Sequence, residues 1–211
     1  MNSNEVIVNL VIIGQTNVGK TCLVNRFIKD TFTTTVSTVG MDFQKTVMEF
    51  DGVKASIRIW DTAGMERYAS ITKSCYTRAD GVLIVFDLTS RASFNSLDLF
   101  IDKVKKFSPK NSIVIICGNK TDLHDQRVIE EQEAIDFAKA NGMPYYEVSC
   151  KLNDNKGVES VMGRLSKETF EIAKRRKEEN DRAWEEHEKI HLENRAKGIV
   201  PNKEKKCCGL L

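Results

Sequence analysis

The residues best suited to bind a phosphate form one uninterrupted run, Gly14-Gln15-Thr16-Asn17-Val18-Gly19-Lys20-Thr21. Glycines at its first and sixth positions let the backbone turn tightly and come close to an anion. The N–H groups of such a loop, and of a helix that begins at its end, point toward that anion. Lys20 adds a positive charge that can reach the β- and γ-phosphates of a nucleotide, and the Thr21 hydroxyl is a suitable Mg²⁺ ligand.

The segments on either side of this run have the character that a phosphate-binding loop requires. Residues 6–13 are apolar and rich in β-branched side chains, which predicts a buried strand. Residues 22–28 place apolar side chains at helical spacing. Strand, glycine loop and helix in this order form the context of a P-loop. A chance glycine turn is the alternative that the rest of the sequence must exclude.

The composition limits the kind of protein. The chain has 211 residues, a formal net charge of +2 and 41% hydrophobic residues. This length favours one domain of about 150–200 residues with an appendage, and the near-neutral charge argues against a nucleic-acid-binding protein. No apolar run approaches the roughly 18 residues of a membrane-spanning helix. Four scattered cysteines lack metal-binding spacing, so we expect reduced thiols in a cytosolic protein: Cys22, Cys75, Cys117 and Cys150.

Strand and helix patterns alternate along the rest of the chain. Asp51-Gly52 separates two alternating runs, residues 43–50 and 53–60, and predicts a β-hairpin. Buried strands are predicted at residues 81–86, 113–117 and 145–148, and helices at about 94–104, 134–138 and 158–172. The alternation predicts an α/β fold: a six-stranded, mostly parallel sheet with one antiparallel edge strand and helices on both faces.

Further motifs stand at the predicted strand ends, where such sheets bind their ligands. Asp61 ends the hairpin and could hold Mg²⁺ through water, and Gly64 could offer its N–H to a γ-phosphate. The Asp122 carboxylate, in Asn119-Lys120-Thr121-Asp122, could accept both N–H donors of guanine, a pair that adenine lacks. Ser149-Cys150-Lys151 could donate a backbone N–H to guanine O6. Each motif alone is weak, but their order and common position favour a guanine-nucleotide site.

With these motifs the chain resembles the Ras superfamily and, within it, the Rab family of small GTPases. The resemblance covers about residues 6–172. It is carried by a paired-cysteine tail and by three segments, Ser37-Thr38-Val39-Gly40-Met41-Asp42-Phe43, Trp60-Asp61-Thr62-Ala63-Gly64 and Glu66-Arg67-Tyr68. It implies a P-loop NTPase G domain over residues 1–173 that binds GTP or GDP with Mg²⁺.

The resemblance also implies roles for single residues. Thr38 would join Lys20 and Thr21 at the Mg²⁺ and γ-phosphate when GTP is bound, and Phe32 would pack over the guanine. The other nucleotide-binding residues that it implies are Gly14, Gln15, Thr16, Asn17, Val18, Gly19, Cys22, Asp61, Gly64, Asn119, Lys120, Asp122, Ser149, Cys150 and Lys151. Residues 31–42 and 62–78, which loss of the γ-phosphate would release, would contact an exchange factor, an activating protein and effectors. Phe43 and Trp60 would take part in these contacts.

Three departures from the family pattern bear on the expected activity. Met65 stands where the family has a glutamine that orients the attacking water, and a thioether cannot align a water as an amide does. The segment 32–38 is one residue shorter than in the family and contains no tyrosine. Cys75 stands where the family has an aromatic residue that completes the effector-reading set. We therefore assign no catalytic side chain and expect slow hydrolysis, with Lys20, Thr38 and Gly64 stabilising the phosphate.

The composition changes at about residue 174 to a charged tail, 174–211. Three pairs at i,i+4 spacing favour an extension of the last helix toward Pro201, while a flexible tether is the alternative. These pairs are Glu171/Arg175, Glu178/Arg182 and Glu185/Lys189. His187 and His191 match the His-Glu-x-x-His pattern of zinc proteases. We reject that function because a third ligand and a cleft are not apparent, and we expect incidental metal binding at most.

The last five residues, Cys207-Cys208-Gly209-Leu210-Leu211, predict attachment of geranylgeranyl by the prenylation machinery to one or both cysteines. Lys203, Lys205 and Lys206 would strengthen binding to anionic lipid. An unmodified thiol pair is the alternative. We expect a protein at the cytoplasmic face of an intracellular membrane, with a soluble cytosolic pool.

The sequence therefore predicts a Rab-like GTPase that acts as a membrane-anchored switch in vesicle trafficking. The first alternative is a guanine-nucleotide-binding scaffold with negligible hydrolysis, because of Met65. A P-loop kinase is a weaker alternative, since it gives no reason for Asn119 and Asp122.

Overall fold

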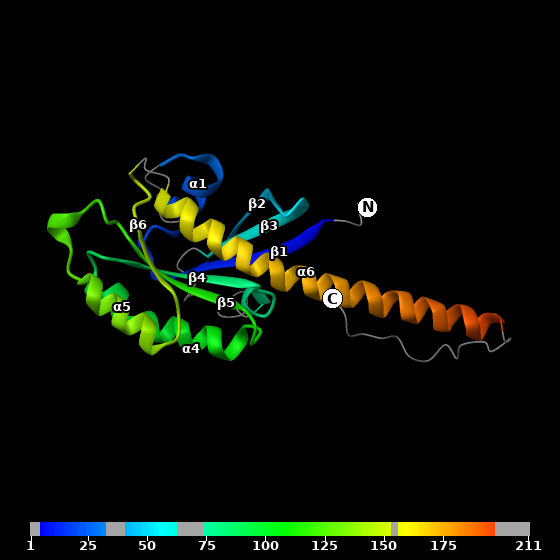
Figure 1. Ribbon diagram of the computed structural model, residues 1–211. Helices are drawn as coiled ribbons and strands as arrows, with labels where there is room; N and C mark the ends of the chain where they lie inside the picture. Colours follow the sequence, from blue (N-terminus) through cyan, green and yellow to red (C-terminus); the bar gives the residue numbers. More distant parts are fainter. Residues whose placement is uncertain (1–4, 33–40, 63–73, 153–155, 197–211) are drawn as a thin grey trace. The chain divides into compact units, whose positions relative to one another are not determined.

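The computed structural model describes residues 5–32, 41–62, 74–152 and 156–196. Its centre is a six-stranded sheet with the order β2-β3-β1-β4-β5-β6 (Figure 1). The strands are β1 (Val6–Ile13), β2 (Met41–Phe50), β3 (Val53–Thr62), β4 (Gly81–Asp87), β5 (Ile113–Asn119) and β6 (Tyr145–Val148). Neighbouring strands pair in parallel except for β2 and β3, which form the antiparallel hairpin. The predicted sheet is confirmed.

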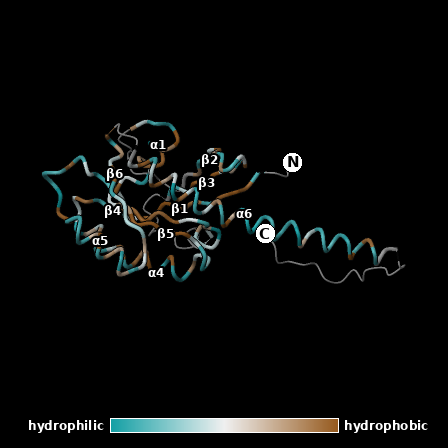
Figure 2. The backbone as a smooth tube through the Cα atoms, in the orientation of Figure 1, coloured by the Kyte–Doolittle hydropathy of each residue, from teal (hydrophilic) through white to brown (hydrophobic). Residues whose placement is uncertain are grey.

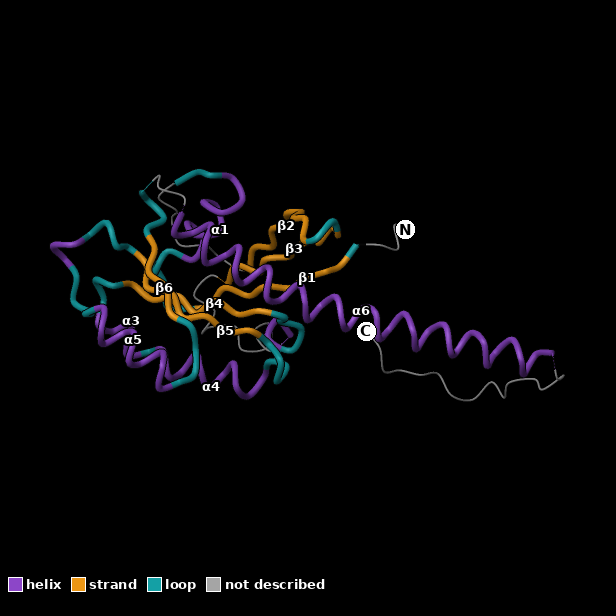
Figure 3. The backbone as a smooth tube through the Cα atoms, viewed as in Figure 1, coloured by secondary structure: helices purple, strands orange, loops and turns teal. Residues whose placement is uncertain are grey.

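Helices alternate with the strands, as Figure 3 shows. The helices whose bounds the structure describes are α1 (Lys20–Lys29), α3 (Arg91–Asn95), α4 (Leu97–Phe107), the 3₁₀ helix η2 (His124–Gln126), α5 (Glu131–Ala140) and α6 (Lys156–Ala196). The prediction of one helix at 94–104 was wrong, because α3 and α4 are separate and meet at Ser96. The Ser96 hydroxyl donates to the carbonyl of Ser93 (2.7 Å), and such local bonds compete with regular helical pairing.

The two faces of the sheet bury two separate cores, because successive side chains of a strand point to opposite sides. Val8, Leu10 and Ile12 of β1 pack into the core shared with α1 and the first part of α6. Val11 and Ile13 pack into the core beneath α3, α4 and α5. Figure 1 shows α4 and α5 on one side of the sheet and α1 on the other, and Figure 2 shows the hydrophobic residues concentrated along the strands. Helices therefore hold both faces of the sheet.

The strand order reverses at β1, which lies between β3 and β4. At such a switch point the loops after the two neighbouring strands diverge and leave room for a ligand at the carboxyl ends. The register places Ile12 beside Asp61, and Asp87 beside Asn119. The phosphate-binding loop, the end of β3 and the ends of β4 and β5 therefore lie at one edge of the sheet.

The chain divides into two compact units, Met1–Ala173 and Lys174–Leu211. In the first unit α6 contributes buried side chains such as Val161, Leu165 and Phe170. In the second unit the side chains of residues 178–193 are all exposed, and Lys177 pairs with Asp181 at 3.4 Å. Of the two alternatives for the tail, the structure has the helix as far as Ala196. None of the helices in the described ranges combines the length and the apolarity of a membrane span.

Candidate functional site

Residues 14–19 connect β1 to α1 in a loop with three positive φ angles. The angle φ is +143° at Gly14, +65° at Asn17 and +98° at Gly19. Glycine adopts positive φ without steric cost, and asparagine tolerates it better than most residues. The residue types in this loop therefore match the backbone that it adopts. Helix α1 begins directly after Gly19, so its first N–H groups open toward the loop.

The two glycines are also required for space. A Cβ atom on Gly14 would lie 2.0 Å from the carbonyl oxygen of Val85 in β4, and one on Gly19 would lie 2.3 Å from Nδ2 of Asn119. Contacts this short force a neighbouring atom to move, and the first neighbour is the backbone of a central strand. The loop is thus packed tightly against β4 and the end of β5.

Lys20 lies across this loop. Its side chain is buried, and Nζ donates to the carbonyl oxygens of Gly14 (2.9 Å) and Gln15 (2.7 Å). These two oxygens belong to neutral peptide groups, so the contacts orient the ammonium without neutralising its charge. A cation held among the loop N–H groups is suited to attract a phosphate.

Thr21 and Asp61 bring together two oxygen donors beside the loop. Asp61, at the end of β3, is fully buried, and its Oδ2 accepts a hydrogen bond from Thr21 Oγ1 at 2.5 Å. Both groups offer only oxygen atoms as ligands. Such a pair fits Mg²⁺, which prefers hard oxygen ligands and retains several waters. The pair joins the start of α1 to β3 across 40 positions of sequence.

Asn119 links the second part of the site to the phosphate-binding loop. It is the last residue of β5, where the sequence predicted it just beyond the strand, and its side chain is buried. Nδ2 donates to the carbonyl oxygen of Val18 at 2.8 Å, and the Cys150 thiol donates to Oδ1 at 3.4 Å. The side chain therefore spans three segments, β5, the loop after β1 and the turn after β6.

Asp122 and Ser149 are joined directly. Ser149 Oγ donates to Asp122 Oδ1 at 2.5 Å and accepts from the backbone N–H groups of Lys151 and Leu152, both at 3.1 Å. One hydroxyl thus orients the carboxylate and shapes the turn that follows β6. The predicted base-reading residues come together here, although two different loops supply them.

Two residues of this region were missed by sequence reasoning. Asp87, at the end of β4, forms a 2.6 Å ion pair with Lys120, and Asp87 Oδ1 accepts a hydrogen bond from the N–H of Thr89 at 2.8 Å. Lys120 has a positive φ of +73°. Arg26 of α1 reaches the turn after β6. The position of Asp87 at the end of an apolar strand was a usable signal. Arg26 gave none, because an arginine on a helix is ordinarily exposed.

Cys150 lies at the centre of the base region with 3% of its surface exposed. Burial is the largest effect on its thiol and raises the pKa to about 12, while the hydrogen bond with Asn119 lowers it. The thiol is therefore protonated at physiological pH and acts as a small apolar group with a weak donor. Cys75 and Cys117 are also buried, Cys22 is half-buried, and all four are free thiols, as predicted.

Several other predicted residues lie at the surface. Gln15 donates to the carbonyl of Ala92 at 3.3 Å. Thr16 and Asn17 are exposed, and so is Phe32, with 38% of its surface accessible. Thr38, Gly64, Met65, Cys207 and Cys208 lie outside the described residues.

Two aromatic side chains predicted to contact effectors pack against each other. Phe43 and Trp60 face across the hairpin with ring centroids 4.8 Å apart, and 44% of the Phe43 surface is exposed. The side chain of Cys75 is buried in the core against which Trp60 packs. The third position of the predicted effector-reading set is therefore a buried cysteine.

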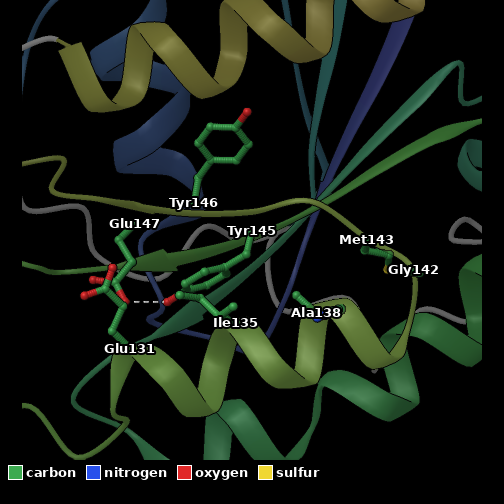
Figure 4. A pocket seen from close by; sticks show the side chains of 9 residues that line it. Glu131, Ile135, Ala138, Gly142, Met143, Tyr145, Tyr146 and Glu147 are labelled. Carbon is green, nitrogen blue, oxygen red and sulfur yellow. Dashed lines mark hydrogen bonds between the residues drawn. The ribbon is translucent and has the colours of Figure 1, made fainter.

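A hollow of about 720 Å³ lies between α5 and β6, and none of the predicted nucleotide-binding residues lines it. Figure 4 shows Tyr145 beside Ile135, with its hydroxyl bonded to Glu147. Burial favours a raised pKa for Glu147, but hydrogen bonds from Arg127 and Tyr145 outweigh it and lower the pKa. The bonds from Arg127 tie β6 to the loop after β5.

His187 and His191 lie on α6 with exposed side chains, and the ring of His187 stacks on that of Trp184 with centroids 6.4 Å apart. Within the described residues, no three His, Cys, Asp or Glu side chains are grouped so that they could hold a metal ion. The geometry here lacks the third ligand that a zinc protease requires.

Comparisons with known proteins agree with this geometry. The model of the Ras family matches residues 9–171. The GTP-binding protein YPT1 of Saccharomyces cerevisiae is 39% identical over 175 residues, which cover 81% of this chain and 84% of the relative. The Ras-related protein Rab-15 of Rattus norvegicus and that of Homo sapiens are each 40% identical over 152 residues, 72% of both chains.

Proposed function

Because this chain belongs to the Ras family and, within it, to the Rab-type small GTPases, we propose that it is a membrane-anchored switch of vesicle trafficking. It binds GTP and GDP with Mg²⁺, hydrolyses GTP slowly and recruits effectors in its GTP form. Residues 1–173 form the G domain and residues 174–211 the tail that carries the anchor. An exchange factor, an activating protein and effectors bind residues 31–42 and 62–78 with Phe43 and Trp60.

One observation carries the nucleotide assignment: the bond of 2.8 Å from Asn119 Nδ2 to the Val18 carbonyl. It joins the loop suited to phosphates with the loop suited to a base, so that a single ligand can occupy both. The Asp122 carboxylate would accept the two N–H donors of guanine, and the hydrogen bond that Ser149 Oγ donates to its Oδ1 orients it for this contact. A P-loop kinase would have no use for this acceptor, and competition between ATP and GTP distinguishes the two. An ATP affinity equal to that for GTP would contradict the assignment.

The Thr21 and Asp61 oxygens are the groups that fit Mg²⁺, with Thr38 added in the GTP form. Bound Mg²⁺ would neutralise charge on the β- and γ-phosphate oxygens. Lys20 holds its ammonium over the same phosphates through its two bonds to loop carbonyls. Gly64 donates its N–H to the γ-phosphate. These groups stabilise the transferring phosphoryl group without any side chain at residue 65.

Met65 determines how fast GTP is hydrolysed. Met65→Gln should raise the rate of single-turnover phosphate release, because an amide can align the attacking water and the other groups are already present. Met65→Leu, which is apolar and similar in volume, is the matched control and should leave the rate unchanged. An ordinary activating protein, whose arginine contributes about 10³–10⁵ in rate, should help less than usual unless it also supplies a glutamine.

The same measurement separates this function from the scaffold alternative. If the wild-type protein turns over as fast as the glutamine variant, another residue positions the water and the role given to Met65 is wrong. If neither protein hydrolyses GTP, the short segment 32–38 is the cause and the protein is a guanine-nucleotide-binding scaffold.

The tail attaches the protein to the cytoplasmic face of an intracellular membrane through prenylated Cys207 and Cys208, and a soluble cytosolic pool exchanges with it. Two lipid chains give stable anchoring where one gives marginal binding. Cys207→Ser with Cys208→Ser should move the protein from the membrane fraction to the cytosol, and each single variant should be intermediate. Cys22→Ser is the control that keeps both tail cysteines. Membrane binding that survives the double variant would overturn the lipid anchor.

A further inference from the structure

Arg26 is a buried arginine whose guanidinium joins two distant segments. Only 7% of its surface is exposed. Nε donates to the Cys150 carbonyl at 3.0 Å and Nη2 to the Lys151 carbonyl at 3.4 Å. Nη1 donates to the carbonyl of Asp30 at 3.1 Å and to its Oδ1 at 3.0 Å. All three nitrogens of the guanidinium are engaged, and each faces a defined acceptor.

The contacts with Cys150 and Lys151 bear on the turn that the proposed guanine site uses. Ser149 Oγ already accepts the N–H groups of Lys151 and Leu152. Of the described residues, none accepts the N–H of Cys150. This amide is therefore the donor of the turn that can meet guanine O6. Arg26 holds the carbonyl of the same residue, so it restrains the Cys150 backbone directly.

The contact with Asp30 holds the guanidinium in place. Asp30 follows α1 with φ of +52°, and its N–H donates to the Arg26 carbonyl at 3.0 Å. Because the guanidinium is planar, acceptors on two of its edges allow it only one orientation, whereas an ammonium on a flexible stem could rotate. Capping α1 alone would not require a contact 124 residues away in sequence.

We propose that Arg26 is a positioning residue for guanine recognition, which holds the Cys150 N–H opposite O6 of the base. The inference rests on the guanine site described under the proposed function. It assigns to Arg26 no contact with the nucleotide. Its effect should therefore depend on whether the base carries O6, which a purely structural role would not.

The test is a cycle of two proteins and two ligands. GDP carries O6, whereas 6-thioguanosine diphosphate carries a weakly accepting sulfur in its place and keeps N1–H, the 2-amino group and both phosphates. Arg26→Ala should weaken GDP binding about tenfold, the size of a lost charge-assisted restraint, and 6-thioguanosine diphosphate binding less than about twofold. Dissociation constants from fluorescence titration give the coupling, because effects common to both ligands cancel.

Two further variants guard against loss of folding. Asp30→Ala alters an exposed side chain and leaves the contact between Arg26 and Cys150. It should therefore weaken GDP binding about two- to threefold and leave binding of the ligand without O6 nearly unchanged. Arg91→Ala is the matched control. Arg91 also ties a carboxylate, Glu133, to a carbonyl, that of Val128, but away from the turn, and its removal should affect both ligands equally.

The outcomes separate the two proposals. If wild-type protein binds both ligands equally, O6 is not read and the guanine site itself is wrong, together with this inference. If wild-type protein prefers GDP but Arg26→Ala weakens both ligands by the same factor, the guanine site stands and the role of Arg26 is overturned. Should Arg26→Ala fail to fold, an Asp30→Ala variant without selective loss overturns it instead.

Discussion

In the proposed nucleotide site most of the groups at the phosphate end lie on one short loop, whereas the groups at the base end come from three separate segments. The loop at 14–19 is shaped by its backbone, with positive φ at three residues and Gly14 against β4. The base end is shaped by side chains: Asn119, Ser149 and Arg26 each bond to a segment far away in sequence.

This difference predicts two kinds of failure. A change that disturbs the unusual backbone of the loop affects all of its N–H groups together, so it should strongly weaken binding of every nucleotide. Side-chain bonds can be lost one at a time, so a change at the base end should weaken binding in steps and according to the base. The following experiments test this contrast, from the largest expected effect to the smallest.

Gly14→Ala should have the largest effect. Its φ of +143° is unfavourable for alanine, and the added Cβ would lie 2.0 Å from the Val85 carbonyl oxygen. We expect nucleotide affinity to fall at least about 100-fold, since strain and displacement each cost on the order of 1–3 kcal/mol, and guanine and xanthine nucleotides to be affected alike. Gly142→Ala is the control, because Gly142 also has positive φ but nothing within 4 Å. Binding within threefold of wild type by Gly14→Ala would contradict the contrast.

Thr21→Asn should affect the phosphate end through Mg²⁺. The hydroxyl beside Asp61 is replaced by an amide, so GTP affinity should fall about 30-fold, the loss of part of a metal contact, and GDP affinity should fall less. The variant should also trap an exchange factor in a nucleotide-depleted form. Titrations at several Mg²⁺ concentrations measure the effect, and in EDTA the wild-type protein and the variant should have the same GTP affinity. A difference that persists in EDTA would mean that Thr21 acts independently of the metal.

Asp122→Asn should change which base is bound rather than whether a nucleotide is bound. The carboxylate that accepts two N–H donors becomes a mixed donor and acceptor, so GTP affinity should fall about tenfold and XTP affinity should rise. The Mg²⁺ dependence should remain that of the wild-type protein. An unchanged ratio of GTP to XTP affinity would show that Asp122 does not read the base.

Cys150→Ala should have the smallest effect on nucleotide binding, and its effect on stability should depend on pH. Burial raises the pKa of the thiol from 9.0 to about 12, so the folded protein favours the protonated form. The resulting stability is fully present below pH 9 and is lost as the pH rises through 12. Between pH 8 and pH 10 the wild-type free energy of unfolding should fall by about 1 kcal/mol more than that of the variant. Equal losses in urea denaturation would show that the thiol ionises freely.

The contrast between the two ends also describes what could be predicted from the sequence. The strands and the hairpin follow from local runs of residues, and their predicted positions are confirmed. The division of one predicted helix into α3 and α4 was missed, because it depends on hydrogen bonds that serine hydroxyls donate to nearby backbone carbonyls in the folded turn. The burial of Cys75 likewise depends on its neighbours in the core.

By itself the sequence predicted the loop at the phosphate end of the proposed site, because its eight residues are contiguous and their types are dictated by local backbone geometry and charge. It also supplied the base-reading residues as separate candidates. Only the tertiary structure decided that Asn119 bonds to Val18, 101 residues away, and that Arg26 bonds to Cys150, 124 residues away. These contacts arise because the sheet order brings the ends of β1, β5 and β6 to one edge, and a residue's local sequence carries no information about which distant carbonyl will face it.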